Sequence, residues 1–422
     1  MDLAEFRNFY NFDDETQDFI VKFGFNEIAD RLEDIPESLS DEYILNALSK
    51  LRKKADASQI LAAADEVRGN RFLRANYNYL CHYWLERSDT LLYGFKLPQF
   101  EEAAEGSEHA GIYNLLAVFA AFEYVEKTYR RLGLPDDIAQ DTLQYTTGAI
   151  MEYASGNDGK LGINGRKLHW FRFYIEGKLF RIGRLEYMIQ DPLSYLPVVY
   201  RRNSDGKVIA LCRNGWVVRK DGLLPFPEDP ADECVTVTLE QTDDTVCGTV
   251  INPAGFVELD RRITLKLDEY TPLWNMWDLV PGIHIPGGGG MKRVLIEDSL
   301  RKARDFFPKY FKRRVAGFSC FSWIFNPDFE EELPNSNLAD FMREVYLFPF
   351  KSVGVEGLQF VFGKSSKDWS DFPADNSLRL AFHRIREAGK RLKAGGMFID
   401  AESIDKFGTQ TYRRDYAAFD EL

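Results

Sequence analysis

The spacing of apolar residues predicts α-helices in the first part of the chain. Between residues 14 and 154, apolar side chains recur every three or four positions, which is the period of a helix with one buried face. This spacing predicts five helical segments, residues 14–34, 40–54, 58–86, 110–131 and 137–154. The loop sequence SGNDGKLGING follows the last of them. The pattern therefore predicts a helical domain over residues 1–165 of the 422.

After residue 165 the pattern changes to short runs rich in aromatic and β-branched residues, which is typical of strands. The segment HWFRFYIEGKLFRIGRLEYMIQ, residues 169–190, predicts a hairpin or paired strands. Within residues 198–267, the runs KVIAL, CVTVTLE, CGTVI and RRITLKL predict an antiparallel meander. Residues 282–362 then alternate strand, helix, strand, helix and strand, the last strand being LQFVFG. We expect an α+β fold whose second domain, residues 166–422, is mixed α/β with a β-rich insertion.

The segment GIHIPGGGGMKRVLIEDSLRKARDFFPKY, residues 282–310, contains a candidate binding loop. A short strand ends at Pro286, because proline has no N–H to donate to a sheet. A helix is predicted to begin near Met291. Glycines are favoured where a backbone approaches a ligand closely, and four of them join the strand to the helix: Gly287, Gly288, Gly289 and Gly290.

Two basic residues, Lys292 and Arg293, fall in the first turn of this predicted helix. The first turn presents free N–H groups and a partial positive charge, so a cation there is unfavourable unless an anion lies nearby. The segment therefore predicts a phosphate-binding site. The alternative is a flexible glycine loop with two solvated basic residues. The spacing matches neither the GxxxxGK[ST] loop nor the GxGxxG loop.

Two further segments complete a recognisable order of elements. AGFSCFSWIF, residues 316–325, predicts a strand, and residues 328–346 contain a predicted helix with Ser336 or Asn337 as its cap. The order strand, Gly-rich loop, helix, strand, helix, strand resembles the coenzyme A-binding core of GNAT acyltransferases. The stretches KLFRIGRLEY, GIHIPGGGG, FSCFSWIFNP, PNSNLADF and FPADNSLRLAF are similar to those of a bacterial family. That family joins an N-acyltransferase N-terminal domain to a GNAT-like C-terminal domain.

The resemblance implies that the Gly-rich loop binds acyl-CoA, because GNAT loops at this place hold the pyrophosphate through backbone N–H groups. The residues implied for this role are Gly287, Gly288, Gly289, Gly290, Met291, Lys292 and Arg293. A strand N–H near Ile285 is the implied oxyanion donor. Further candidate contacts with the cofactor are Ser322, Asn335 and Asn337, although hydrogen bonds within the core and helix capping also explain such residues. The Gln or Arg that leads the usual GNAT loop is not evident here.

The implied reaction is direct attack of an amine on the acyl-CoA thioester, which requires a base, an oxyanion donor and an acid. His284 is the candidate base, because it points away from the face of Ile283 and its ordinary pKa lies near neutrality. A packed structural histidine is the alternative. GNAT enzymes often take the acid from a Tyr on the helix after the fifth strand, where this chain offers Met342 and, beyond it, Tyr346. Arg181 and Arg184 are further candidates for binding a carboxylate or phosphate, or else an ion-paired face.

The implied function is an N-acyltransferase that uses acyl-CoA, with acetyl-CoA as the expected donor. The implied acceptor is a small-molecule or peptide amine. A non-catalytic GNAT-like module that binds acyl-CoA or another ligand is the alternative. A lipase-like hydrolase is disfavoured, because the glycines after His284 are not accompanied by a GxSxG motif anywhere in the chain.

Composition narrows the expected partners and location. The formal net charge of −13 argues against nucleic acids and anionic membranes as partners. No apolar run reaches the roughly 20 residues of a membrane span. The five cysteines form no CxxC pair and the five histidines are scattered, so neither a disulfide framework nor a metal site is expected. With no basic leader at its start, the chain is expected to be cytoplasmic. The oligomeric state is left open.

Overall fold

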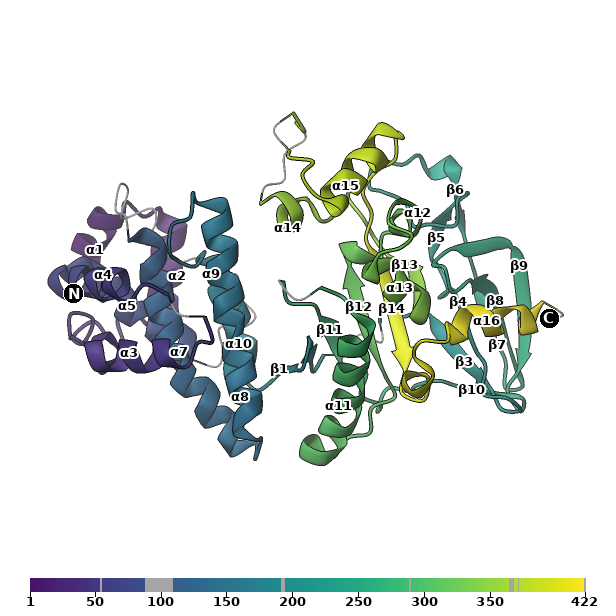
Figure 1. The fold of residues 1–422 in the computed structure, drawn as a ribbon, viewed down its shortest axis with the longest axis horizontal. Coiled ribbons are helices and arrows are strands. Elements are labelled where there is room, and N and C mark those ends of the chain that lie inside the picture. Colours follow the sequence, from purple (N-terminus) through teal and green to yellow (C-terminus); the bar gives the residue numbers. More distant parts are fainter. Residues whose placement is uncertain are drawn as a thin grey trace. The chain divides into compact units, whose positions relative to one another are not determined.

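The computed structural model describes residues 1–53, 55–87, 109–190, 194–287, 290–363, 368–370 and 372–420. Contacts within the chain divide it into two compact units. The first comprises Met1–Ile182 with Pro286–Gly288, and the second comprises Gly183–Ile285 with Gly289–Leu422. The first unit is built mainly of helices, and the second is mixed α/β with antiparallel sheets (Figure 1). The predicted α+β fold is therefore confirmed.

The central helix of the first unit is α7 (Ala110–Arg131), whose bounds agree with those predicted. Its run from Ile112 to Phe122 is buried, as expected of a helix that is apolar on almost all sides. The one amide in this run, on Asn114, donates to the carbonyl oxygen of Ile163 at 3.1 Å. The helices that pack against α7 are α3 (Asp41–Ser49), α4 (Ala57–Gly69), α5 (Arg71–Cys81), α8 (Asp136–Leu143) and α10 (Arg166–Ile175).

The remaining described helices of this unit are α1 (Leu3–Tyr10), α2 (Asp14–Lys22) and α9 (Tyr145–Gly156), with a π-helical turn at His82–Glu86. Ser40 caps α3 as predicted, by accepting the N–H of Tyr43 at 3.2 Å. The predicted helix over residues 58–86 is divided at Asn70, whose side chain caps α5. Among the residues that the structure describes, no helix is both long enough and apolar enough to cross a bilayer.

The prediction of paired strands over residues 169–190 is wrong in its first half. This half forms α10, which buries Leu168, Phe171 and Ile175 at helical spacing, and strands begin only with β1 (Leu179–Ile182) and β2 (Leu185–Met188). Because α10 packs on α7, the first compact unit extends to Ile182 rather than ending near residue 165. Aromatic residues suit both a strand and a buried helix face, which is why the sequence misled here.

Within the second unit, the first sheet has the strand order β2-β11-β12-β14-β13. β11 and β12 are parallel, and the other neighbours are antiparallel. Helix α11 (Arg293–Phe311) connects β11 to β12 and lies against β2. There, the hydroxyl groups of Ser299 and Tyr187 are hydrogen-bonded at 2.9 Å. The other strands of this sheet are β11 (Gly282–His284), β12 (Gly317–Ser322), β13 (Tyr346–Pro349) and β14 (Gly395–Asp400).

The predicted strand LQFVFG is instead a short helix, α14 (Leu358–Phe362). The strand that follows the predicted helix of residues 328–346 is instead β13, which begins at Tyr346. That helix is divided into α12 (Asp328–Glu332) and α13 (Asn337–Glu344), and Ser336 caps α13 through the N–H of Ala339. The last helices of the unit are α15 (Ser377–Glu387) and α16 (Thr411–Tyr416).

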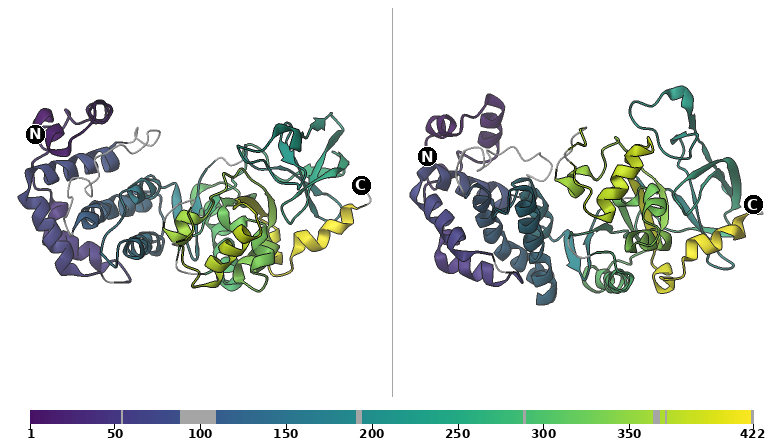
Figure 2. Two further views of the ribbon diagram at one scale, coloured as in Figure 1. Left: turned by 90° about the horizontal axis from the view of Figure 1, so that it is seen from above. Right: turned by 45° about the horizontal axis from the view of Figure 1, so that its top comes forward.

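The second sheet of this unit is antiparallel as predicted, and its strands are drawn in teal in Figure 2. It is not a simple meander, because its order is β10-β3-β4-β8-β7, with β9 also paired to β8, and some neighbouring strands are not consecutive in the sequence. Its core contains Tyr200, Ile209 and Val250, and Phe419 near the end of the chain packs into it. The strands of this sheet are β3 (Val198–Arg202), β4 (Val208–Leu211), β7 (Leu239–Gln241), β8 (Thr245–Ile251), β9 (Val257–Lys266) and β10 (Tyr270–Pro272), and a separate pair is formed by β5 (Val217–Arg219) and β6 (Cys234–Thr236).

Buried polar groups connect the two sheets of the second unit. The hydroxyl of Tyr346 in β13 donates to the carbonyl oxygen of Ile251 at 2.5 Å and accepts the N–H of Ala210 at 3.3 Å. The carboxylate of Asp400 in β14 accepts from the guanidinium of Arg201 in β3 at 2.7 Å. Hydrogen bonds are directional, so these contacts fix the orientation of one sheet against the other.

Replacing Tyr346 with Phe should lower the free energy of unfolding by about 1–3 kcal/mol, because it leaves two buried backbone groups without their partner. Urea denaturation measures the loss. Tyr310→Phe, at a partly exposed position on α11, is the matched control and should change stability by no more than a few tenths of a kcal/mol. Equal stabilities of the two variants would contradict a structural role for the Tyr346 hydroxyl.

Candidate functional site

The parallel strands β11 and β12 separate beyond Gly282 and Ser319, after an earlier bridge between Leu279 and Val315. In the described part of the sheet, Gly282 pairs with Ser319, and the N–H of Ser319 donates to the carbonyl oxygen of Pro281 at 3.1 Å. Beyond this pair, β11 continues along β2 as far as His284, while β12 continues along β14 as far as Ser322. The sheet therefore opens between these two strands, and we call this feature the β11–β12 opening.

The edges of the β11–β12 opening present backbone hydrogen-bonding groups. N–H and C=O groups alternate in direction along a strand. Because the N–H of Ser319 points toward β11, the N–H and C=O of Phe321, two residues on, point into the opening. By the same alternation, the C=O of Ile283 and the N–H of Ile285 face it from the other side. An extended ligand with amide groups can bind such edges as an added strand.

Helix α11 is the next helix after β11 in the sequence, and it begins at Arg293 rather than at the predicted Met291. Its N-cap residue, Lys292, makes no side-chain cap hydrogen bond in the described structure, and no acidic residue occupies the first turn. The first-turn N–H groups of a helix of 19 residues and its partial positive charge favour an anion at this end. The side chain of Lys292 is exposed and adds to that charge.

Arg184, in the turn before β2, contacts the end of the glycine loop. Its Nε donates to the carbonyl oxygen of Gly290 at 2.7 Å. Gly290 has a φ of 61°, a left-handed conformation that glycine adopts without strain. The guanidinium of Arg293 lies close to Gly408, where an added Cβ would be 3.0 Å from Nη1. Positive side chains thus flank the start of α11, and Arg184, a predicted candidate for binding a carboxylate or phosphate, is one of them.

The other predicted cofactor contacts stay predictions. Gly287 is exposed and belongs by its contacts to the first unit, and Gly288 and Gly289 lie outside the described residues. Met291 is half-buried at the end of the loop. The Oγ of Ser322 accepts the N–H of Ile324 and so caps a turn of 3-10 helix.

Asn335 and Asn337 are exposed beside the cap of α13, and Ser336 rather than Asn337 provides that cap. Most basic side chains of α15 and the following segment form ion pairs, for example Arg384 with Glu332 and Lys393 with Asp328. These pairs favour the interpretation of this segment as an ion-paired surface.

We call the face of the first sheet that is turned away from α11 the far face. The side chain of Tyr187 faces α11, because its hydroxyl is hydrogen-bonded to Ser299 of that helix. Ile283, the cross-strand partner of Tyr187, and Phe318, whose ring packs on Tyr187, therefore also face α11. Side chains one residue along point the other way. The far face therefore carries Glu186 of β2, His284 of β11, and Ser319 and Phe321 of β12.

The far face is polar near β11 and aromatic beyond it. Burial lowers the pKa of His284 to about 4, so the imidazole is neutral at pH 7. Glu186, directly opposite His284 in the β2–β11 ladder, is 1% exposed. Phe321 packs on Phe350 with ring centroids 4.7 Å apart and on Tyr195 at 6.0 Å. Neutral imidazole, buried carboxyl group and aromatic rings thus surround one side of the β11–β12 opening.

The placement of Tyr346 does not fit its predicted role as an acid. It lies in a strand rather than on the helix, it is fully buried, and its hydroxyl is bonded to the second sheet. Burial raises the pKa of this phenol well above its ordinary value. The buried thiol of Cys320 also has a raised pKa, of about 12, because of burial, which is typical of a small core residue.

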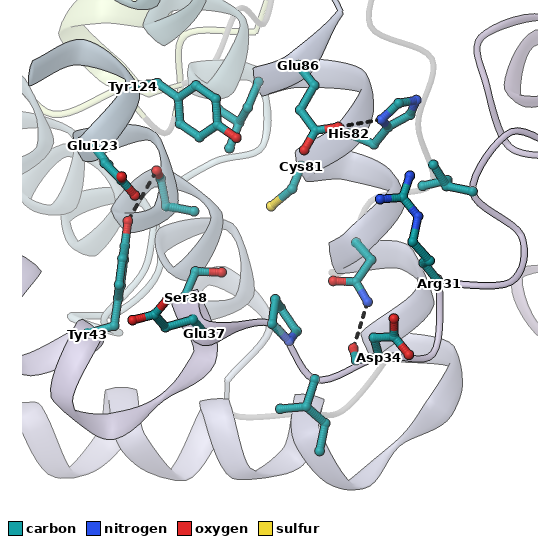
Figure 3. Close-up of a pocket in the computed structure, with 16 residues that line it drawn as sticks. Arg31, Asp34, Glu37, Ser38, Tyr43, Cys81, His82, Glu86, Glu123 and Tyr124 are labelled. Atoms are coloured by element: carbon teal, nitrogen blue, oxygen red, sulfur yellow. Dashed lines mark hydrogen bonds and ion pairs between the residues drawn. The ribbon is translucent and has the colours of Figure 1, made fainter. Parts of the chain in front are cut away.

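A cavity of about 480 Å³ lies within the first unit, away from any predicted site residue (Figure 3). Its wall includes four carboxylates and Arg31. Burial, followed by the charge of Glu86, raises the pKa of Tyr124 in the same wall to about 12. The negative potential disfavours an anionic cofactor here. The four carboxylates belong to Asp34, Glu37, Glu86 and Glu123.

No sequence pattern indicates this cavity, because its wall comes from segments that lie apart in the chain. The sequence does mark Glu186 as unusual, because a charged residue inside the apolar strand LEYM is rare unless it is paired or functional. No group of three or more His, Cys, Asp or Glu side chains suited to a metal occurs in the described segments.

The topology and the opened parallel pair define a GNAT-like acyltransferase fold. The family model "GNAT-like C-terminal domain" matches residues 179–398, more than half of the chain, and the chain belongs to this family. No protein of curated function matches the sequence significantly.

Solved structures of acyltransferases share the fold over nearly the whole chain. A complex of an acyltransferase mutant with octanoyl-CoA has a TM-score of 0.60 at 18% identity, covering 95% of this chain and 99% of that one. A complex with decanoyl-CoA and teicoplanin has a TM-score of 0.59 at 18% identity, covering 95% and 100%. A complex with CoA and 10C-teicoplanin has a TM-score of 0.60 at 17% identity, with the same coverage. At these identities the likeness establishes the fold.

The pKa of His284 predicts a pH dependence of stability. Between pH 7 and pH 4 the unfolded chain binds a proton at this residue that the folded protein does not, because the pKa falls from about 6.5 to about 4 on folding. The free energy of unfolding should therefore fall by up to roughly 3 kcal/mol as the pH drops from about 6.5 to about 4. In His284→Asn this part of the loss should disappear. Urea denaturation from pH 8 to pH 4 measures it, and parallel curves for both proteins would contradict the lowered pKa.

Proposed function

We propose that this protein is an acyl-CoA-dependent N-acyltransferase. The β11–β12 opening is the observation that carries this proposal, because its unpaired edges suit the extended, amide-containing pantetheine arm of coenzyme A. Membership in the GNAT-like family and the likeness to acyltransferases bound to octanoyl-CoA and decanoyl-CoA support it.

The start of α11 is the proposed site for the pyrophosphate of the cofactor. The N-terminal N–H groups of the helix bind phosphate oxygens, and Lys292 and Arg184 supply positive charge beside them. The predicted donor was acetyl-CoA. The aromatic side chains of Phe321, Phe350 and Tyr195 on the far face favour a longer, apolar acyl chain, for which contact with aromatic rings is favourable.

The proposed reaction forms a C–N bond and breaks the C–S bond of the thioester. The neutral amine attacks the carbonyl carbon, and the N–H of Ile285 or Phe321 at the opening stabilises the oxyanion. The attacking nitrogen becomes more acidic than the free ammonium ion once it is bonded to the carbonyl carbon, and the neutral imidazole of His284 accepts its proton. His284 then returns this proton to the departing thiolate. One residue serves as base and acid, which removes the need for Tyr346.

The acceptor is proposed to be a small-molecule or peptide amine. Two of the similar structures contain teicoplanin or an acylated form of it. The alternative is a module that binds acyl-CoA without turnover, which the commitment of Tyr346 to the sheet interface favours.

Lys292→Glu should weaken octanoyl-CoA binding about tenfold, because it reverses a charge beside the proposed pyrophosphate site. Isothermal titration calorimetry measures the affinity. Lys309→Glu, an exposed residue in the last turn of the same helix, is the control and should bind as the wild type does. Equal loss in both variants would indicate a nonspecific charge effect and contradict the site.

Acyl transfer should release free coenzyme A thiol only when an amine acceptor is present, and His284→Asn should lower kcat by roughly a hundredfold. A thiol-specific colorimetric reagent follows the release, with octanoyl-CoA and acetyl-CoA as donors and a panel of primary amines as acceptors. Tight donor binding without amine-dependent thiol release would favour the binding module over the enzyme.

A further inference from the structure

We propose that Gln190 binds the thioester carbonyl of the acyl donor through its side-chain amide, at the closed end of the β11–β12 opening. The closed end is the pair formed by Gly282 and Ser319, beyond which the two strands separate. This role of Gln190 rests on the proposed function, because it names the side chain that holds the reacting carbonyl. The observation behind it is the close approach of the Gln190 amide to Gly282.

The amide of Gln190 lies directly on Gly282. A Cβ added to Gly282 would be 2.0 Å from Nε2 and 3.1 Å from Oε1 of Gln190, so the amide fills the space that any other side chain would occupy. Gly282 precedes His284 by two residues in β11, and this space is therefore on the far face. Among the residues that the structure describes, the half-buried amide of Gln190 makes no hydrogen bond.

Ser319 places a second polar group beside this amide. It is the strand partner of Gly282, its side chain is on the far face, and it is 0% exposed. Its Oγ has no hydrogen-bond partner in the described part of the chain. Neighbouring strands lie about 4.8 Å apart, so the hydroxyl of Ser319 and the amide on Gly282 flank the same point. A buried hydroxyl without a partner is unfavourable, and a carbonyl oxygen that arrives with a ligand supplies the missing acceptor.

The proposed course of the pantetheine arm brings the thioester to this point. With the pyrophosphate at the start of α11, the arm runs back along β11 toward Gly282. The strands pair at Gly282 and Ser319, so the ligand cannot continue between them. Helix α11 packs against the other face of the sheet, so the acyl group leaves on the far face. The thioester therefore passes the amide of Gln190.

An amide N–H suits this role, because it donates to the carbonyl oxygen both in the thioester and in the tetrahedral intermediate. Such a hydrogen bond strengthens as negative charge develops on the oxygen. Gln190 thus adds a side-chain donor to the backbone N–H of Phe321, which lies two residues beyond Ser319 on the edge of the opening. Gly282 belongs to the same arrangement, because only glycine leaves room for the amide at this position.

The test compares octanoyl-CoA with S-octyl-CoA, a thioether in which a CH2 group replaces the carbonyl. Isothermal titration calorimetry should show that the wild type binds the thioester about tenfold more tightly, which is the effect of one or two hydrogen bonds. In Gln190→Leu this preference should fall to about threefold or less. Equal affinities in the wild type would overturn the proposal, and so would an undiminished preference in the variant.

Gly282→Ala is a second variant, which leaves Gln190 in the chain. The new methyl group should displace the amide, which is the end of a flexible side chain, while the strand conformation of Gly282 also suits alanine. The preference for octanoyl-CoA over S-octyl-CoA should fall as it does in Gln190→Leu. A methyl group that merely obstructed the acyl chain would weaken both ligands equally, and the unchanged preference would contradict the role of Gln190.

Gly248→Ala in β8 is the matched control. A Cβ there would be 2.6 Å from Cδ1 of Leu239, so this variant also displaces the end of a flexible side chain, but in the second sheet. It should keep the wild-type preference for octanoyl-CoA. A loss of preference equal to that of Gly282→Ala would show a general effect of strand packing and overturn the proposal.

The same two ligands separate the role of Gln190 from the proposed function. Binding of both ligands without preference in the wild type would leave the coenzyme A site in place and overturn only the role of Gln190. Binding of neither ligand would contradict the proposed function and, with it, the role of Gln190.

Discussion

The structure of the second unit depends on one constraint, the limited pairing of β11 with β12. Each strand keeps its outer partner, β2 on one side and β14 on the other, so the sheet stays intact while its centre opens. Unpaired strand edges in the middle of a sheet are unfavourable unless a ligand or water satisfies them. Pro286, two residues after β11, has no N–H to offer on the side of β2 and so limits that outer ladder.

The surrounding contacts keep this opening in shape. Helix α11 packs on one face through Tyr187 and Ser299. On the outer strands, Tyr346 and Asp400 anchor β13 and β14 to the second sheet. A ligand site is most accurate when rigid elements support it. The antiparallel insertion thus contributes to the site without supplying any of its residues, by restraining two strands of the first sheet.

The sequence predicted elements whose periodicity was unambiguous. Helix α7 was predicted with its correct bounds, because a long apolar run with a glycine and a proline after it has one interpretation. Helix α10 and strand β13 were misread, because aromatic residues are buried equally well in helices and strands. His284 was found because its segment is unusual in itself. Glu186 was not singled out, although it is a charged residue in an apolar strand, because its position opposite His284 depends on a register between strands that lie far apart in the sequence.

The proposed function would also couple the stability of the fold to the supply of the acyl donor. In the proposed function, the donor occupies the place of a missing strand and binds the folded protein alone. At a donor concentration 100 times its dissociation constant, such binding adds about 2.7 kcal/mol to the free energy of unfolding. Natural domains are stable by only about 5–15 kcal/mol. The lifetime of this protein in the cell would then follow the supply of its acyl donor, with the opening between β11 and β12 acting as the point where that supply is sensed.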